Sequence, residues 1–235
     1  MKRTILIRGQ TVVYTLERKR VKNINLRVKR DGGIAVSAAP WVPLGVIERF
    51  LLSRGDFLLR ALAGSERREA QPWAEGRELR YLGRPLRLTL AQGTRTRVEL
   101  GDGVLRLTLR APDDPERVRG AVERWYRAES ERLCRTYCER LRPRFAPRGV
   151  PEPEIRMRAM RSAWGNCRPA RGVVTFNSML AAAEPACIEY VVAHELTHFL
   201  HADHSPAFYA ALARVIPDWK ERRARLKALA AVLFS

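Results

Sequence analysis

One apolar helix that carries histidines constrains the fold of this chain more than any other feature. All four histidines of the sequence lie close together, at His194, His198, His201 and His204. Pro185 predicts the first turn of a helix that runs through the first two of them. Its apolar residues are too numerous for a surface position: Ile188, Val191, Val192, Leu196, Phe199 and Leu200. We therefore expect a buried helix, on which unpaired imidazoles would be costly.

The segment His194-Glu195-Leu196-Thr197-His198 has the pattern H-E-x-x-H. Residues four apart share one face of a helix, so His194 and His198 can direct ring nitrogens at one ion, with bonds of roughly 2.0 to 2.1 Å for zinc. Glu195 lies one position round the helix, where a carboxylate takes a proton from an activated water and passes it to a leaving amine. The pattern predicts one catalytic divalent ion, zinc, with Glu195 as general base in the hydrolysis of an amide bond.

A catalytic zinc site usually needs a third protein ligand, and two histidines are candidates. His201 shares the helical face, but its distance along a straight helix from His194 is roughly 10 Å. His204 reaches the ion if the helix ends near Ala202 and the chain turns back. Ser205-Pro206 supports such a turn, because serine as N-cap and proline at the first position begin a new helix. We expect His204 to be the third ligand.

The spacing of His194, His198 and His204 equals that of the metzincin zinc peptidases. His201 stands where the metzincin pattern has glycine. No methionine follows Met179, so the Met-turn of that class is absent from the sequence. The chain is therefore not an ordinary metzincin.

Alternating apolar residues predict a β-rich N-terminal half. Residues 24–28 and 86–90 alternate apolar with polar side chains, as strands with one buried face do. Gly101-Asp102-Gly103 predicts a hairpin turn, and a helix is expected after Pro43. We predict that residues 1–112 form a β-rich domain of two antiparallel meanders around one helix, with a weak internal duplication.

Residues 113–235 are predicted to form a second, more helical domain. Asp114-Pro115 begins a long helix, with aspartate as N-cap and proline at the first position, and Pro143 is expected to end it. Short strands are expected at 155–160 and 173–176, before the histidine-bearing helix. The predicted fold class is α+β, with the antiparallel β-rich part packed against the helical part.

Three further segments precede the histidine motif. They are Arg161-Ser162-Ala163-Trp164-Gly165-Asn166-Cys167, Phe176-Asn177-Ser178-Met179-Leu180 and Ile188-Glu189-Tyr190-Val191-Val192. Together with the H-E-L-T-H segment, with His204-Ser205-Pro206-Ala207-Phe208 and with a basic stretch from Arg18 to Ile24, they resemble the YgjP-like metal-dependent hydrolases. These are relatives of the SprT-like and WLM zinc peptidases, and the resemblance extends over nearly the whole chain.

The resemblance implies a zincin-like metallopeptidase domain that carries H-E-x-x-H on a buried helix. It further implies that His194, His198 and His204 are the metal ligands and that Glu195 is the general base. It is specific for the fold and the metal site, and it implies little about the substrate.

The segment before the motif departs from the usual pattern of that family. Ala163 stands where arginine is common, and Asn166 stands where serine is common. Trp164 and Gly165 are interpreted as a packing residue and a tight turn.

The composition is strongly basic, with a formal net charge of +19. Such a charge favours an acidic partner, with nucleic acid the first candidate, although scattered arginines with few lysines are also typical of GC-rich coding. No segment approaches the roughly 20 apolar residues that cross a bilayer. The N-terminus lacks a signal-peptide core, and the four cysteines form no dense disulfide framework. We expect a cytoplasmic protein with reduced thiols and no contact with a membrane.

The leading functional hypothesis is a zinc-dependent peptidase that acts on a peptide or protein. Two alternatives stay open: a basic nucleic-acid-associated module that processes DNA-bound protein, as in the related SprT-like enzymes, and a metal-binding scaffold that cuts nothing. Tyr190 and Tyr209 are each either a donor to an oxyanion or an aromatic residue of the core or rim. The sequence does not determine the substrate or the oligomeric state.

Overall fold

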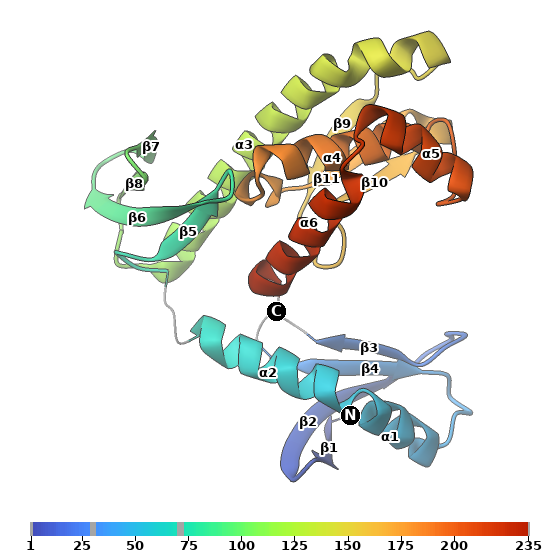
Figure 1. Cartoon of the computed structure of the whole chain (residues 1–235). Helices are drawn as coiled ribbons and strands as arrows, with labels where there is room; N and C mark the ends of the chain where they lie inside the picture. The colour runs from blue at the N-terminus through green and yellow to red at the C-terminus, as the bar shows by residue number, and fades with distance from the viewer. Residues whose placement is uncertain (1, 29–31, 70–72, 235) are drawn as a thin grey trace. The chain divides into compact units, whose positions relative to one another are not determined.

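The structure of the chain is a computed structural model that describes residues 2–28, 32–69 and 73–234. The chain divides into two compact units, residues 1–72 and 73–234, which are coloured blue to cyan and green to red in Figure 1. Both units contain helices and strands. The α+β class predicted from the sequence is confirmed.

The first unit is a sheet packed against helices. Its described elements are β1 (Lys2–Ile7), β2 (Gln10–Arg18), β3 (Asn25–Val28), β4 (Ile34–Ala38), α1 (Leu44–Ser53) and α2 (Gly55–Glu69). The strand order among the described residues is β1-β2-β4-β3, with β2 and β4 parallel and the outer pairs antiparallel. Tyr14, Val36 and Leu51 are buried in its core.

The single helix predicted after Pro43 is wrong, because the structure has two helices there. The first ends at Ser53 and the second begins at Gly55, a residue type that weakens a helix interior. A Cβ atom on Gly55 would lie 2.8 Å from Cγ2 of Ile7. The glycine therefore also allows the start of α2 to approach the sheet closely.

The second unit begins with a sheet of the same topology. Its strands are β5 (Glu78–Tyr81), β6 (Arg84–Gln92), β7 (Arg97–Gly101) and β8 (Val104–Leu109). Their order is β5-β6-β8-β7, again with a parallel central pair between two antiparallel hairpins. The turn between β7 and β8 confirms the predicted hairpin. The predicted antiparallel meanders are wrong, because in each sheet the two hairpins are joined by a parallel pair of strands, β2 with β4 and β6 with β8. The shared strand order supports the predicted duplication.

A long helix, α3 (Pro115–Phe145), follows the second sheet. The side chain of Asp114 accepts hydrogen bonds from the main-chain N–H groups of Glu116 and Arg117, as expected of an N-cap. The prediction that Pro143 ends the helix is wrong, since α3 continues to Phe145. A proline in the last turn removes only one N–H donor, so the helix tolerates it near its end.

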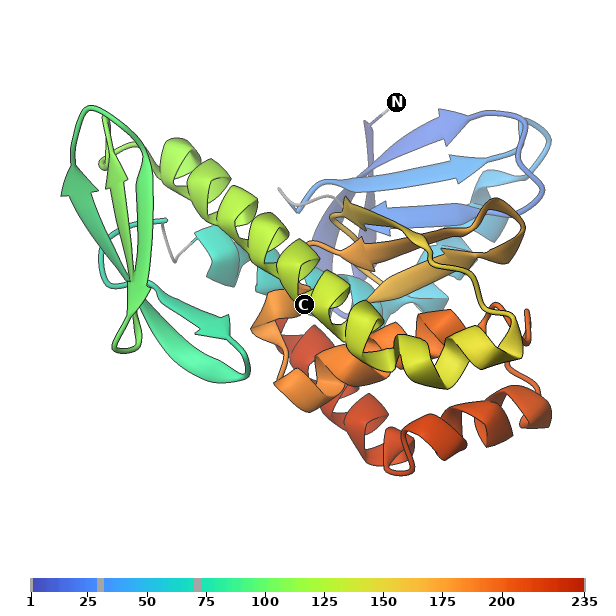
Figure 2. The same cartoon turned by 90° about the horizontal axis from the view of Figure 1, so that it is seen from above.

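The rest of the second unit surrounds the helix that carries the histidines. Its elements are η1 (Ala146–Arg148), β9 (Glu154–Arg158), β10 (Gly165–Arg168), η2 (Pro169–Arg171), β11 (Val173–Asn177), η3 (Leu180–Ala182), α4 (Pro185–Thr197), α5 (Pro206–Val215) and α6 (Trp219–Leu233). The small sheet has the order β10-β11-β9 within residues 73–234. Helix α4 packs between α3 and α6 (Figure 1), and the small sheet lies against α3 and α4 (Figure 2). The predicted burial of α4 is confirmed, since Ile188, Val192 and Leu196 are almost inaccessible to solvent.

The turn between β5 and β6 attaches the second sheet to the segment before α4. The main-chain N–H groups of Leu82 and Gly83 donate to the carbonyls of Ala181 and Ala182, at 2.8 and 3.2 Å. Gly83 has a φ of +78°, and a Cβ atom there would lie 2.5 Å from Cγ of Glu184. Only glycine satisfies both the backbone conformation and this close approach.

The boundary between the compact units differs from the predicted domain boundary after residue 112. Apolar residues of β5, β6 and β8 share one core with α3 and α4, so residues 73–112 are part of the second compact unit. Compactness does not establish whether a segment folds alone. The division into domains 1–112 and 113–235 therefore stays a prediction.

Candidate metal centre

Three of the four histidines converge at the end of α4. His194 lies in the last turn of the helix and His198 is its C-cap residue. The chain then turns, and Ser205 caps the start of α5 through a hydrogen bond from the N–H of Phe208. Within the described parts of the chain, His194, His198 and His204 form a group whose candidate ligand atoms lie within 4.8 Å of one another. The turn that the sequence predicts before Ser205 thus brings His204 back to the helix.

His201 is not part of this group. Its main-chain carbonyl instead lies 3.2 Å from Nδ1 of His198. Because a carbonyl only accepts, Nδ1 of His198 carries the hydrogen, and Nε2 is the nitrogen with a lone pair. An orienting bond of this kind is typical of metal-binding histidines.

The ring of one phenylalanine contacts all three imidazoles. Phe208 is fully buried, and its ring centroid lies 4.7 to 4.9 Å from those of His194, His198 and His204. Phe208 is not among the site residues predicted from the sequence. Its position in the first turn of α5, four residues after His204, is the signal that would have revealed it.

The chemistry of the three rings fits a divalent ion. Burial, followed by the neighbouring His198 and His204, lowers the pKa of His194 to about 3, and burial also lowers the pKa of His198. Both rings are therefore neutral at pH 7, the form that binds metal. Nε2 of His204 lies 3.0 Å from Nε2 of His194. Two nitrogens that share a tetrahedral zinc ion at roughly 2.0 to 2.1 Å are about 3.4 Å apart, so the spacing suits zinc.

Glu195 follows His194 in α4 and has a buried carboxyl group. The residue is 4% exposed, and none of the described residues forms a hydrogen bond with its Oε2 atom. Burial raises the pKa of Glu195 to about 8. A carboxyl group with a pKa in this range, and with one oxygen that has no hydrogen-bond partner among the described residues, is suited to exchanging a proton near neutral pH.

Gly165 provides the space for the Glu195 carboxyl. A Cβ atom at position 165 would lie 2.4 Å from Oε1 of Glu195 and 2.7 Å from its Cδ atom. The interpretation of Gly165 as a tight turn is wrong, since the residue is the first of strand β10. The main chain of β10 therefore lies directly against the carboxyl, a contact that sequence spacing does not reveal.

Asn177 fixes the loop that leads into β10. Its fully buried side chain donates from Nδ2 to the carbonyls of Met160 and Ala163, at 2.8 and 2.9 Å. Its main-chain N–H donates to the carbonyl of Trp164 at 2.9 Å. These three bonds hold both ends of the loop just before Gly165. Asn177 thus supports the site without touching the histidines.

The two tyrosines singled out in the sequence both lie near the histidines. The ring of Tyr190 is 5.8 Å from that of His194, and burial raises its pKa to about 12, so its hydroxyl stays protonated. Tyr209 stacks over His204 at 6.1 Å and against Trp219 at 4.5 Å. The role of either hydroxyl as a donor to an oxyanion stays a prediction.

Comparison with known families gives this site a context. The model of the family described as YgjP-like, metallopeptidase domain, matches residues 22–229, which include every residue of the site. The chain belongs to the YgjP-like family. Membership makes it a metal-dependent hydrolase by class and implies a divalent ion and a peptide or protein substrate. A search of curated proteins found no match to the sequence.

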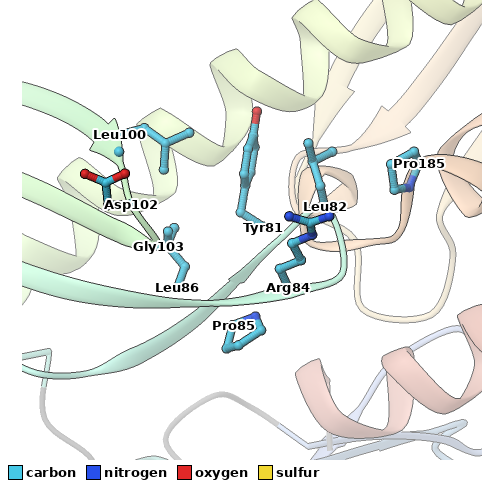
Figure 3. Close-up of a pocket in the computed structure, with 10 residues that line it drawn as sticks. Tyr81, Leu82, Arg84, Pro85, Leu86, Leu100, Asp102, Gly103 and Pro185 are labelled. Atoms are coloured by element: carbon cyan, nitrogen blue, oxygen red, sulfur yellow. The ribbon is translucent and has the colours of Figure 1, made fainter.

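One pocket of the YgjP-like chain lies away from the histidines. It has a volume of about 450 Å³ and lies between the β5–β6 turn, the β7–β8 turn and the start of α4. Figure 3 shows Tyr81, Leu82, Arg84, Asp102 and Pro185 among its lining residues. Pro185 precedes His194 by about 14 Å of helix rise. The pocket is therefore not part of the candidate metal centre.

Cysteine chemistry does not account for this YgjP-like site. The four cysteines are free thiols. Cys167 lies on β10, and burial, followed by the negative charge of Glu195, raises its pKa to about 12. Since the thiolate is the reactive form, Cys167 is a poor nucleophile at neutral pH.

The predictions on membrane contact, location and nucleic-acid binding concern the YgjP-like chain as a whole. None of the helices in residues 2–28, 32–69 and 73–234 has the length and apolar character that a membrane span requires. The cytoplasmic location and the binding of nucleic acid through the positive charge stay predictions.

We predict that Gly165→Ala destabilises the YgjP-like protein by about 1 to 3 kcal/mol, because the added methyl group overlaps the Glu195 carboxyl. The loss should largely disappear in the Glu195→Ala background, which removes the overlapping atoms. Urea unfolding of the four proteins measures this coupling. Gly101→Ala is the matched control, since no atom lies within 4 Å of a Cβ at that position. Equal losses in both backgrounds would show that the contact is not the cause.

We also predict that the contribution of Glu195 to the stability of the metal-free protein declines as the pH rises from 4.5 to 8. Burial raises the pKa of Glu195 in the folded state to about 8, above its ordinary value of 4.5. At this carboxyl the folded state therefore binds more protons than the unfolded state, and its contribution to the unfolding free energy falls by roughly 4 kcal/mol as the pH rises. The lowered pKa of His194 acts in the opposite direction, so the decline is read as the difference between the wild type and the metal-free Glu195→Gln variant, which lacks the carboxyl. Parallel pH profiles of unfolding free energy for the two proteins would disprove the assignment.

Proposed function

We propose that this chain is a zinc-dependent peptidase in which His194, His198 and His204 hold one zinc ion and Glu195 is the general base. The observation that carries the proposal is the burial of the Glu195 carboxyl, whose Oε2 atom has no hydrogen-bond partner among the described residues. Glu195 directly follows His194, one of the three imidazoles that converge. Three protein ligands with a fourth position open are typical of catalytic zinc, whereas structural zinc usually has four protein ligands.

Each residue of the site has a defined task in this proposal. When bound, zinc supplies a Lewis acid for the substrate carbonyl and lowers the pKa of a water molecule. The imidazoles bind as neutral rings, with His198 oriented by the carbonyl of His201. Glu195 accepts a proton from water at Oε2 and transfers it to the nitrogen of the leaving amine. The surrounding apolar residues exclude bulk water from the carboxyl.

The free edge of β10 supports a peptide as the substrate. Among the strands that the structure describes, β10 pairs with β11 alone and lies at the edge of the small sheet. The Trp164 carbonyl accepts from Asn177 across this pair, so the alternation of an antiparallel ladder turns the main-chain groups of Gly165 and Cys167 toward the free edge. An extended peptide that pairs there would run directly beside Glu195. Other amides lack the repeating N–H and C=O groups that such an edge binds.

We predict that Glu195→Gln lowers kcat/KM for hydrolysis of a quenched-fluorescent peptide library by about 10²-fold to 10⁴-fold, because the amide cannot accept the proton. The variant should keep one zinc per chain, measured by mass spectrometry of the metal. Glu139→Gln, which changes an exposed carboxylate on α3, is the control and should remain fully active. A fully active Glu195→Gln protein would exclude the general-base role. A wild-type protein that binds zinc but cuts nothing would favour the scaffold alternative.

A further inference from the structure

Helix α6 borders the candidate metal centre from one end to the other. Near its start, Trp219 stacks on Tyr209 at 4.5 Å, and Tyr209 stacks over His204 at 6.1 Å. At its end, Phe234 packs on Trp164 with ring centroids 5.1 Å apart. Trp164 directly precedes the glycine that contacts Glu195. The residues of α6 between these two contacts therefore pass beside the metal centre.

Helix geometry places Arg223 on the flank of α6 that faces this site. Successive residues are rotated by about 100° around a helix axis. On this basis Trp219, Arg223 and Phe234 fall within about 60° of one another. Arg223 lies one turn after Trp219, so it stands between the two aromatic contacts and on the same side of the helix.

The neighbouring arginines of α6 are bound to acidic residues of the fold. Arg222 forms an ion pair with Glu189 at 2.7 Å, and Arg225 forms one with Glu184 at 2.9 Å. These pairs join α6 to α4 and to the N-cap residue of α4. Arg223 is exposed, and no ion pair or hydrogen bond of its side chain occurs with any residue that the structure describes. Its charge is therefore not used to hold the helix in place.

The charge of Arg223 acts on the site itself. The guanidinium group of Arg223 lies within electrostatic reach of both His194 and Tyr190. A divalent ion held by the three imidazoles would add more positive charge. The combined positive charge attracts an anionic group of a bound substrate.

We infer that Arg223 is a specificity-determining residue that binds a carboxylate of the substrate. The inference rests on the proposed function and names its substrate class: peptides with an acidic group close to the bond that is cut. A guanidinium group binds a carboxylate through two parallel hydrogen bonds. In a peptide, that carboxylate is either an aspartate or glutamate side chain or the C-terminal group.

Binding to the zinc-loaded Glu195→Gln protein tests this inference without depending on hydrolysis. The probes are fluorescein-labelled peptides of one parent sequence, with Glu or Gln in the chain and with a free acid or an amide at the C-terminus. Fluorescence anisotropy should give about fivefold tighter binding for a peptide with the recognised carboxylate. A preference for Glu over Gln identifies the side chain, and a preference for acid over amide identifies the C-terminus. The preference should weaken as salt is added.

A second substitution, made in the Glu195→Gln protein, tests whether the preference for a carboxylate depends on Arg223. Arg223→Gln should abolish it, Arg223→Lys should keep part of it, and Arg223→Glu should reverse it in favour of peptides with Lys in place of Glu. Lys227→Gln removes the same charge one turn farther along α6 and should leave it intact. Circular dichroism checks that each variant is folded.

Three results would overturn the inference: no preference for either carboxylate, a preference that persists in Arg223→Gln, or no binding of any of these peptides. Hydrolysis by the wild type is measured separately. A preference that follows Arg223 in a protein that never cuts would refute the proposed function alone. Hydrolysis without the preference would refute only the role of Arg223.

Discussion

The contact between the carboxyl group of Glu195 and the main chain of β10 is the constraint on which the second unit depends. A carboxyl that is 4% exposed requires a strand without a side chain at that point, and Gly165 provides it. The strand in turn requires a fixed loop before it, and Asn177 holds that loop through buried hydrogen bonds. The site is therefore built from tertiary contacts around α4 as much as from the motif on α4.

The same burial leaves polar groups without partners in the protein alone. Nδ1 of His194 and Oε2 of Glu195 are both buried and lack a hydrogen-bond partner among the described residues, and such groups usually cost stability. A divalent ion that attracts the negative charge of the carboxylate offsets part of this cost at Glu195. Metal binding and folding stability are therefore expected to be coupled in the second unit. The fully buried Phe208 keeps the three rings together in either state.

The sequence predicts the parts of the structure that local signals encode. Asp114-Pro115, Pro185 and Ser205-Pro206 mark the starts of α3, α4 and α5 correctly, because capping groups and proline act within one turn. The Ser205-Pro206 signal also predicts the turn that brings His204 close to His194 and His198. The YgjP-like assignment rests on these local motifs as well, and the family model confirms it.

The parts that depend on long-range contacts are not visible in the sequence. The parallel pairing of β6 with β8 replaces the expected meander, since alternation shows which face is buried but not which strand is adjacent. The importance of Gly165 depends on its contact with Glu195, thirty residues later in the chain. In the sequence, nothing distinguishes Arg223 from the other arginines. In the fold, Arg222 and Arg225 form ion pairs with Glu189 and Glu184, whereas Arg223 forms none with the described residues.

Anomalous diffraction at the zinc absorption edge, from crystals grown with one equivalent of zinc, tests the central claim most directly. The account predicts one strong peak, bonded to Nε2 of His194, His198 and His204 at roughly 2.0 to 2.1 Å, with Glu195 beside it but not bonded to it. A peak at any other group of residues, or no peak between these three histidines, would contradict it.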